Sequence, residues 1–288
     1  MPRIYIAKIS KSLQPSSAPF RYPSYSLDWG VEQDFLRYLE TQPELLTTDA
    51  SSADFVYLPI FWTRYHLSND YGRFGLDELQ AGADEVLSLG KPTFTVCQYD
   101  DGPLIYLGKS RVYLSSRKSE DGVDAPLLAS PLPTPFQVGL KREKHLASFV
   151  GRSDTHELRL HLLDSLKGID GVYVSTKSMR PRRFSRLLRE SVITLAPRGY
   201  GGSSFRFFEA LQCGSIPWLI GDLDTRPFKD EIDWDAGSFY SSSVEDFHVK
   251  FTRLQHYNLA AMKQFVIEEL APRFRFGAWN ELLIRDLT

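Results

Sequence analysis

A strand, loop, helix and strand in the middle of the sequence constrain the fold of this chain more than any other feature. Residues 191–196 and 216–220 are apolar runs that suit two buried strands. Between them lie a glycine-rich loop and a helical segment that Gly214 is expected to end. We expect the loop glycines to adopt positive φ and Ser203 or Ser204 to cap the helix.

A helix that begins directly after a glycine loop offers backbone N–H groups and a partial positive charge to an anion. We therefore expect a phosphate-binding loop, built from Arg198, Gly199, Tyr200, Gly202, Ser203, Ser204, Arg206 and Glu209. Two alternatives stay open: the loop binds nothing, or Arg206 and Glu209 simply pair with each other along the helix. The segment is neither a P-loop, because no Gly-Lys-Ser/Thr follows, nor a dinucleotide fingerprint, because Ser204 replaces its third glycine.

The charge of the chain is unevenly distributed. The 288 residues carry a net charge of −2, which argues against a general nucleic-acid binder. Residues 141–210, however, contain fourteen Lys and Arg against seven Asp and Glu, which indicates a local anionic ligand. For Arg182, Arg183, Arg186 and Arg189 a solvated helix face is an equal alternative.

Other features of the composition bound the class of protein. The hydrophobic content of 42% supports a sizeable core, and no apolar run is long enough to cross a membrane. The N-terminus resembles a strand and not a signal peptide. Cys97 and Cys213 are expected to be free buried thiols in a reducing compartment, and we expect a cytoplasmic protein.

Strands and helices alternate along the chain, which predicts α/β architecture with parallel sheets. Strands are expected at 3–9, 54–59, 92–97, 111–114, 145–150, 171–174, 191–196 and 216–220. Helices are expected at 29–39, 76–89, 156–166, 181–189, directly after the glycine loop, at 254–270 and at 278–286. A proline-rich crossing separates two such blocks, so we expect two doubly wound domains. The expected divisions are residues 1–140, residues 141–270 and a final helix, 271–288, packing back on the first domain.

Several segments, in the right order, resemble the exostosin-like glycosyltransferases. They are Ala53–Pro59, Ser148–Arg152, Phe184–Leu188, Ser191–Gly199 and Ser204–Leu211 with Gly214 and Ile216-Pro217. The strong part of the resemblance covers about residues 145–225. Eukaryotic members usually carry an N-terminal membrane anchor and work in the Golgi, whereas this chain resembles a short bacterial or viral type that works in the cytoplasm, the host's if viral.

The resemblance implies a GT-B fold with two Rossmann-like domains facing a central cleft. It also implies an inverting transfer of a sugar from a UDP-sugar to a hydroxyl of a glycan acceptor, with no metal and no other cofactor. Arg152, Arg198 and the amides around Gly202 would neutralise the leaving diphosphate, and Glu209 would accept the ribose hydroxyls. Two Asp-x-Asp segments, 222–224 and 233–235, resemble a metal motif of a different glycosyltransferase fold, and we interpret both as unrelated to metal binding.

An inverting transfer needs a base, which we expect from the N-terminal domain. Asp100 is the first candidate because it follows a predicted strand, and His66 and Asp101 are the others. Alternatively, each of these three residues is simply a polar loop residue that faces water. Aromatic residues near the N-terminal loops suggest a sugar-stacking platform, although most could equally be core: Phe20, Tyr22, Tyr25, Trp29, Phe61, Trp62 and Tyr65, with Asp28 and Arg64 as polar neighbours. A non-catalytic nucleotide-sugar or glycan binding module on the same fold remains the competing hypothesis. A phosphatase or kinase is a weaker hypothesis, because it would need a lysine or a metal cluster beside the glycine loop and the sequence shows neither.

Overall fold

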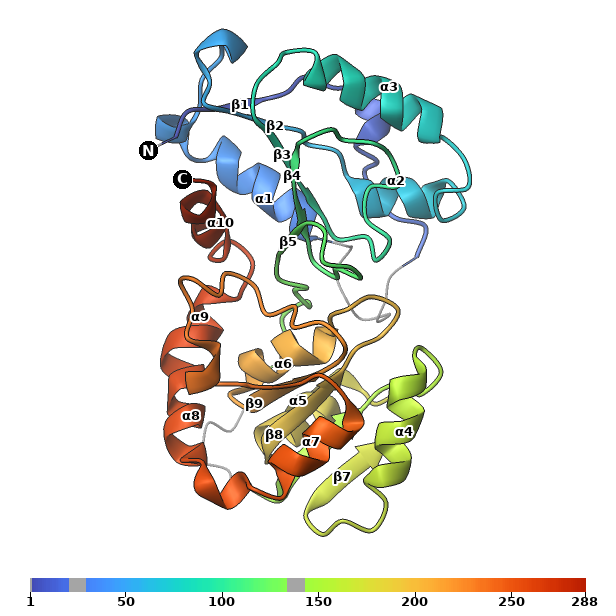
Figure 1. Cartoon of the computed structure of the whole chain (residues 1–288), viewed down its shortest axis with the longest axis vertical. Coiled ribbons are helices and arrows are strands. Elements are labelled where there is room, and N and C mark those ends of the chain that lie inside the picture. The colour runs from blue at the N-terminus through green and yellow to red at the C-terminus, as the bar shows by residue number, and fades with distance from the viewer. Residues whose placement is uncertain (1, 21–29, 134–142) are drawn as a thin grey trace. The chain divides into compact units, whose positions relative to one another are not determined.

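The structure is a computed structural model that describes residues 2–20, 30–133 and 143–288. It divides into two compact units (Figure 1). Unit 1 comprises Met1–Pro126 and Phe276–Thr288, and unit 2 comprises Leu127–Arg275. The divisions expected from the sequence fall after residues 140 and 270, whereas the units meet after Pro126 and Arg275.

Unit 1 contains a parallel sheet of five strands in the order β1-β2-β3-β4-β5. The strands are β1 (Ile4–Ile6), β2 (Phe55–Tyr57), β3 (Thr93–Cys97), β4 (Arg111–Leu114) and β5 (Val123–Asp124). Its helices are α1 (Val31–Glu40), α2 (Trp62–Ser68), α3 (Leu76–Leu87) and α10 (Asn280–Leu287).

Helices cover both faces of this sheet because alternate strand residues point to opposite sides. On one face Phe35 of α1 packs against Tyr57 and Phe94, with ring centroids 5.1 and 5.9 Å apart. On the other face Val56 belongs to an apolar cluster that includes Leu79 of α3. The expected doubly wound arrangement is therefore confirmed for unit 1.

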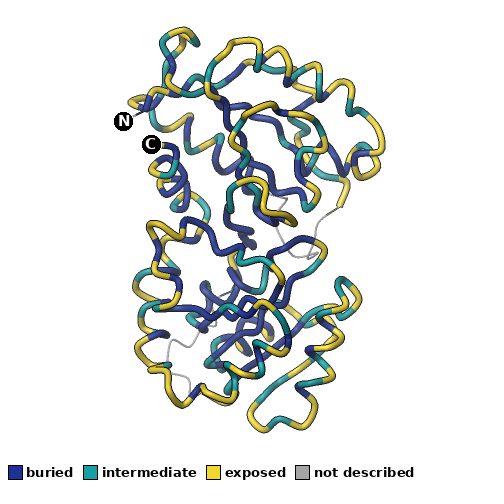
Figure 2. The backbone as a smooth tube through the Cα atoms, viewed as in Figure 1, coloured by how far each residue is buried: buried dark blue, intermediate teal, exposed yellow. Residues whose placement is uncertain are grey.

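Unit 2 contains a second parallel sheet of five strands, in the order β10-β9-β8-β6-β7. The strands are β6 (His145–Val150), β7 (Val172–Ser175), β8 (Ser191–Pro197), β9 (Ile216–Ile220) and β10 (Phe239–Ser241). Its helices are α4 (Glu157–Ser165), α5 (Pro181–Arg189), α6 (Phe205–Cys213), α7 (Val244–Phe251), α8 (Leu259–Phe265) and the short α9 (Ala271–Arg273). Buried residues concentrate in the strands of both units (Figure 2). The α/β class with two Rossmann-like sheets, as expected of a GT-B fold, is confirmed.

The order of strands in unit 2 creates a topological switch point. The chain passes from β6 to β7 on one side and then returns to β8 on the other side of β6. Ligands of doubly wound sheets bind at the carboxyl ends of the strands at such a point. Here those ends are the segments that follow Val150 and Pro197.

Three details differ from the expectations. The helix expected at 254–270 is interrupted, because the side chain of Asn258 accepts a hydrogen bond from the Ala261 amide and begins a new helix, α8. The expected positive φ at the loop glycines 199, 201 and 202 is wrong, although Gly214 does end α6 with φ 68°. Ser204 occupies the N-cap position of α6, but its side chain makes no capping hydrogen bond.

Within the described ranges, no helix is both long and apolar enough to cross a membrane. Cys97 and Cys213 are buried free thiols, as expected.

Candidate functional site

The carboxyl edge of the unit 2 sheet brings Arg152 and Arg198 to neighbouring loops. Arg152 follows β6, Arg198 follows β8, and the two strands pair directly in parallel. This part of the sequence prediction depends only on two adjacent strands ending at one edge, and the structure places both residues there.

Arg159, which the sequence reasoning missed, joins the two loops. Its guanidinium, on the buried side of α4, donates to the carbonyls of Arg152 (3.0 Å), Pro197 (2.9 Å) and Arg198 (2.8 Å). A Cβ atom on Gly199 would lie 3.3 Å from Arg159 Nη2, so the loop passes this side chain closely. The sequence contained one indication that Arg159 is buried: it lies on the same helix face as Leu162, which is fully buried.

The two arginines expected to bind a diphosphate are paired with carboxylates. The half-exposed Arg152 binds Asp154 through two hydrogen bonds of 2.9 and 2.8 Å, which lower the pKa of that carboxyl. Arg198 is buried, donates to the carbonyl of Gly201 at 3.2 Å and forms an ion pair with Asp222, whose side chain is 62% exposed. Both carboxylates are exposed enough to be exchanged for another anion.

On α6, Arg206 and Glu209 form the ion pair that the sequence left open as an alternative. Arg206 also donates to the carbonyl of Val150 at 2.6 Å and lies 4.6 Å from the centre of the Phe184 ring. The side chain of Glu209 is fully buried. In this conformation Arg206 orients Glu209 and fastens α6 to the end of β6, and a ribose hydroxyl could reach Glu209 only if the side chain became accessible.

The remaining loop residues differ in exposure. Ser203 and Ser204 are buried, whereas Tyr200 is 58% exposed. The hydroxyl of Thr225 donates to the carbonyl of Gly202 at 3.3 Å. Thr225 thus holds the loop through the carbonyl of Gly202, and the ring of Tyr200 is exposed to solvent.

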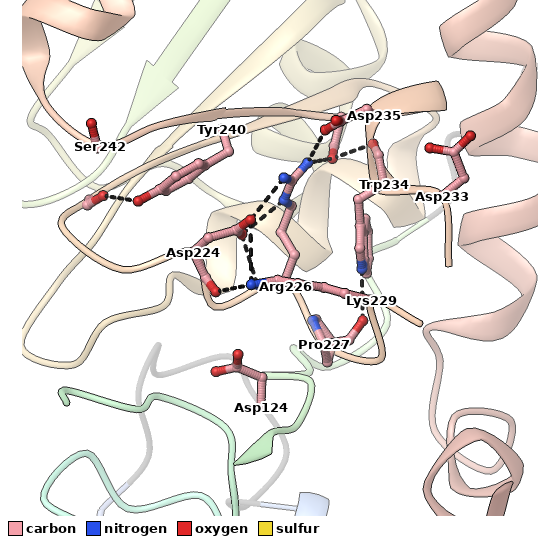
Figure 3. A network of polar contacts seen from close by, with 12 residues as sticks. Asp124, Asp224, Arg226, Pro227, Lys229, Asp233, Trp234, Asp235, Tyr240 and Ser242 are labelled. Carbon is pink, nitrogen blue, oxygen red and sulfur yellow. Dashed lines mark hydrogen bonds and ion pairs between the residues drawn. The ribbon is translucent and has the colours of Figure 1, made fainter. Parts of the chain in front are cut away.

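One aspartate of each Asp-x-Asp segment, Asp224 and Asp235, binds the side chain of Arg226 (Figure 3). Arg226 forms a bidentate pair with Asp224 at 2.9 Å and a second pair with Asp235 at 2.8 Å. Burial raises the pKa of Asp224, but hydrogen bonds and charge from Arg226 and Lys229 outweigh it, so the net pKa is lowered. Asp233 accepts from the amide of Ala236. The carboxylates of these segments are therefore used in the local structure, and the described residues contain no cluster suited to a metal ion.

The three expected bases in unit 1 occupy different environments. Asp100 lies in a half-buried turn after β3, and Asp101 is half-exposed and ion-paired with Lys118. His66 is fully buried, and its Nε2 donates to the carbonyl of Pro103 at 3.0 Å. Burial lowers the pKa of His66 to about 4, and within the described part of the chain its Nδ1 has no hydrogen-bond partner. These surroundings are those of a core histidine and do not favour it as a base that contacts substrate.

A buried carboxylate that the sequence analysis did not single out, Glu32, lies near the carboxyl ends of β2 and β3 in unit 1. Glu32, near the start of α1, accepts from the amide of Thr63 (3.1 Å), its hydroxyl (2.9 Å) and the amide of Gln98 (2.9 Å). Gln98 in turn accepts from the amide of Val31 at 3.0 Å. Desolvation by burial raises the pKa of Glu32 to about 7 against the lowering effect of these hydrogen bonds. Glu32 thus ties the start of α1 to the segments after β2 and β3.

The expected aromatic platform is only partly described. Trp62 and Tyr65 are buried core residues, so they are unsuited to stacking on a sugar, while Phe20 is exposed and lies 5.9 Å from the ring of Tyr71. Phe61 is half-buried, and Arg64 donates to the carbonyl of Pro15. Tyr22, Tyr25, Asp28 and Trp29 lie outside the described residues.

Comparison with known proteins identifies relatives of this chain. Residues 3–245 match the family described as Exostosin GT47 domain. Exostosin-1 of Drosophila melanogaster is 34% identical over 122 residues, which cover 34% of this chain and 16% of that protein. Exostosin-1 homolog of Caenorhabditis elegans is 40% identical over 55 residues, which cover 19% of this chain and 14% of that protein. The matched segments thus span less than a fifth of these relatives.

Solved structures resemble the chain only distantly. AviGT4, a glycosyltransferase involved in avilamycin A biosynthesis, aligns with 100% of this chain and 96% of its own, at 12% identity and a TM-score of 0.37. The pneumococcal O-GlcNAc transferase GtfA, in complex with UDP and GlcNAc, aligns with 83% of this chain and 45% of its own, at 14% identity and a TM-score of 0.37.

Proposed function

The chain belongs to the exostosin GT47 family, and on that premise we propose that it is an inverting glycosyltransferase that uses a UDP-sugar and a glycan acceptor. The proposal rests on three arginines, Arg152, Arg159 and Arg198, which lie together at the switch point of the unit 2 sheet. The unpaired cysteines agree with the cytoplasmic location that we include in the proposal.

In the proposed reaction the acceptor oxygen attacks the anomeric carbon while the bond from that carbon to the diphosphate breaks. The acceptor proton passes to a base, and UDP leaves with the negative charge that develops on the diphosphate. Arginines and the amides at the start of α6 would stabilise that charge in a site where they are already oriented.

Exchange of Asp154 for a diphosphate is energetically reasonable. The pair between Arg152 and Asp154 is exposed, so solvent screens the attraction between the two charges. A charge-assisted hydrogen bond in a less solvated site contributes about 1.5–3 kcal/mol. The donor would therefore displace the carboxylate, and Arg152 would become available when the donor binds.

We propose that this transfer needs no divalent metal. Asp224 and Asp235 already bind the guanidinium of Arg226, so a metal would have to compete with a buried cation for the same oxygens. For the base we propose Asp100, which lies in the turn directly after β3, whereas His66 is buried in the core.

The test measures UDP binding by calorimetry and turnover against a panel of UDP-sugars. Arg152→Gln should weaken UDP binding by about 10–100-fold with unchanged thermal stability, since the side chain is half-exposed. Lys167→Gln, an exposed change in the same unit, is the matched control and should leave binding unaltered. EDTA should not reduce turnover.

UDP binding without turnover of any donor, for every acceptor tried, would favour the non-catalytic binding module instead. No binding of UDP by the wild-type chain would contradict both the transfer from a UDP-sugar and the nucleotide-sugar binding module, and would favour a module that binds glycans.

A further inference from the structure

The helices α1 and α2 of unit 1 are capped by side chains from other parts of the chain. Neither N-cap residue provides a side-chain hydrogen bond of its own. The side chain of Gln98 accepts from the amide of Val31, the first residue of α1, at 3.0 Å. The carboxyl group of Glu32 accepts from the amide of Thr63, in the first turn of α2, at 3.1 Å. These two side chains satisfy amides that a helix start leaves without an intrahelical partner.

Glu32 and Gln98 are also bonded to each other. The amide of Gln98 donates at 2.9 Å to the same Glu32 oxygen that accepts from the amide and the hydroxyl of Thr63. All three residues are buried, so solvent has no direct access to these hydrogen bonds. Without the carboxyl group, the amides of Gln98 and Thr63 would lose their acceptor. Glu32 therefore fixes the backbone at Gln98, directly after β3.

The turn that carries Asp100 starts at the next residue. The carbonyl of Tyr99 accepts from the amide of Gly102 at 3.0 Å, and Gly102 has a φ of 70°. Asp100 is half-buried in this turn, two residues after Gln98. A displacement of the Gln98 amide would therefore move the Asp100 carboxyl group with it.

The far end of the turn depends on Glu32 as well, through α2. The carbonyl of Pro103 accepts from His66 of α2 at 3.0 Å, and the His66 ring lies 4.7 Å from that of Tyr99. Since α2 begins on the Glu32 carboxyl group, both attachments of the turn lead back to this one side chain.

We propose that Glu32 is a positioning residue of the transfer reaction, which holds the turn of residues 99–102 so that Asp100 meets the acceptor hydroxyl in the right place. Glu32 is fully buried and acts without contacting substrate. The inference rests on the proposed function for the role of Asp100, whereas the position of the turn can be measured without turnover.

The first experiment compares kcat and KM of the wild-type chain with those of Glu32 variants. Glu32→Leu keeps the volume and removes the acceptor, so kcat should fall about 10–100-fold, as expected when a reacting group is misplaced by about 1 Å. The donor KM and the affinity for UDP should change less than about twofold, because the donor edge lies in unit 2. Glu32→Gln keeps a carbonyl oxygen in place for the amide of Gln98 and should retain kcat within about threefold.

Asp34→Ala is the matched control. Asp34 lies in the same turn of α1, is buried, and accepts three hydrogen bonds from the segment that contains α10, none of them from the turn after β3. Its loss should destabilise unit 1 and leave kcat within about twofold of the wild type.

The second experiment follows hydrogen exchange of the Gln98 and Gly102 amides by NMR. Both should exchange at least about tenfold faster in Glu32→Leu than in Asp34→Ala or the wild type. If Glu32→Leu does not fold, Glu32→Asp replaces it in both experiments, because its shorter side chain draws the carboxylate away from the Gln98 amide and should act in the same direction.

Three results would overturn the proposal: a wild-type kcat without the acceptor at Glu32, an equal loss of kcat in Asp34→Ala, or a loss in Glu32→Gln as large as in Glu32→Leu. A wild-type chain that transfers no sugar would refute the proposed function instead. Hydrogen exchange then still tests the turn, and unchanged exchange of the Gly102 amide in the Glu32 variant would refute the positioning by Glu32.

Discussion

The most quantitative prediction concerns Glu32, whose buried carboxyl group has a pKa of about 7 against an ordinary value of 4.5. The native state binds the Glu32 proton more tightly than the unfolded state does. Its stabilising effect is therefore complete below pH 4.5 and is lost as pH rises through 7. A shift of this size corresponds to about 3 kcal/mol at 1.36 kcal/mol per pH unit.

Glu32→Gln removes this titration. The difference in unfolding free energy, variant minus wild type, should grow by about 3 kcal/mol in favour of the variant between pH 4.5 and pH 7, and then level off. The amide changes the hydrogen bonds to Thr63 and Gln98, but that cost is the same at every pH. His66, whose pKa is lowered to about 4, gives the opposite trend, because its contribution is lost as pH falls from 6.5 through 4. Both proteins contain His66, so its effect cancels in the difference.

Urea unfolding read by pulsed hydrogen exchange of β3 would isolate unit 1 from unit 2. Glu44→Gln makes the same chemical change at an exposed position and serves as the control. A difference that stays constant with pH, or that shrinks as pH rises, would refute the assignment of a raised pKa to Glu32.

Three further changes test the packing around the two sheets. Arg159→Lys removes at least one of three buried hydrogen bonds to loop carbonyls, so UDP affinity should fall by about tenfold or more in calorimetry; unchanged affinity would mean that the loops hold their positions without it. Asp34→Ala removes the acceptor of three hydrogen bonds from the segment that contains α10, and should cost about 2–4 kcal/mol, seen as faster hydrogen exchange of α10. Arg226→Met leaves Asp224 without its bidentate partner and should cost about 2–3 kcal/mol, measured as a lower melting temperature near pH 7; a more stable variant would show that the network of Figure 3 does not support the fold.

The sequence was most informative where local patterns determine structure. The strand at 145–150 and the helix at 181–189 match β6 and α5 because apolar runs and a helix-starting proline mark their limits. The helix α7 was overlooked although Ser243 caps it through the amide of Asp246, a local signal that was present. The helix α2 was overlooked because the apolar residues before it continue directly from a strand.

The candidate site was less accessible to sequence reasoning. Arg152 and Arg198 were found because each follows a recognisable strand. Arg159 was not, since its three acceptors are brought together only by the fold. Glu32 meets Thr63 and Gln98 across more than thirty residues of chain, so nothing in its neighbouring sequence indicates a shifted pKa.

The central claim is that a diphosphate binds at the carboxyl ends of β6 and β8, and a crystal structure with UDP tests it most directly. We predict a diphosphate beside the loop of residues 198–204, in contact with Arg152 and the amides at the start of α6, with Arg152 separated from Asp154. UDP bound elsewhere on the chain, or a loop that stays empty at saturating UDP with Arg152 still paired to Asp154, would contradict the account.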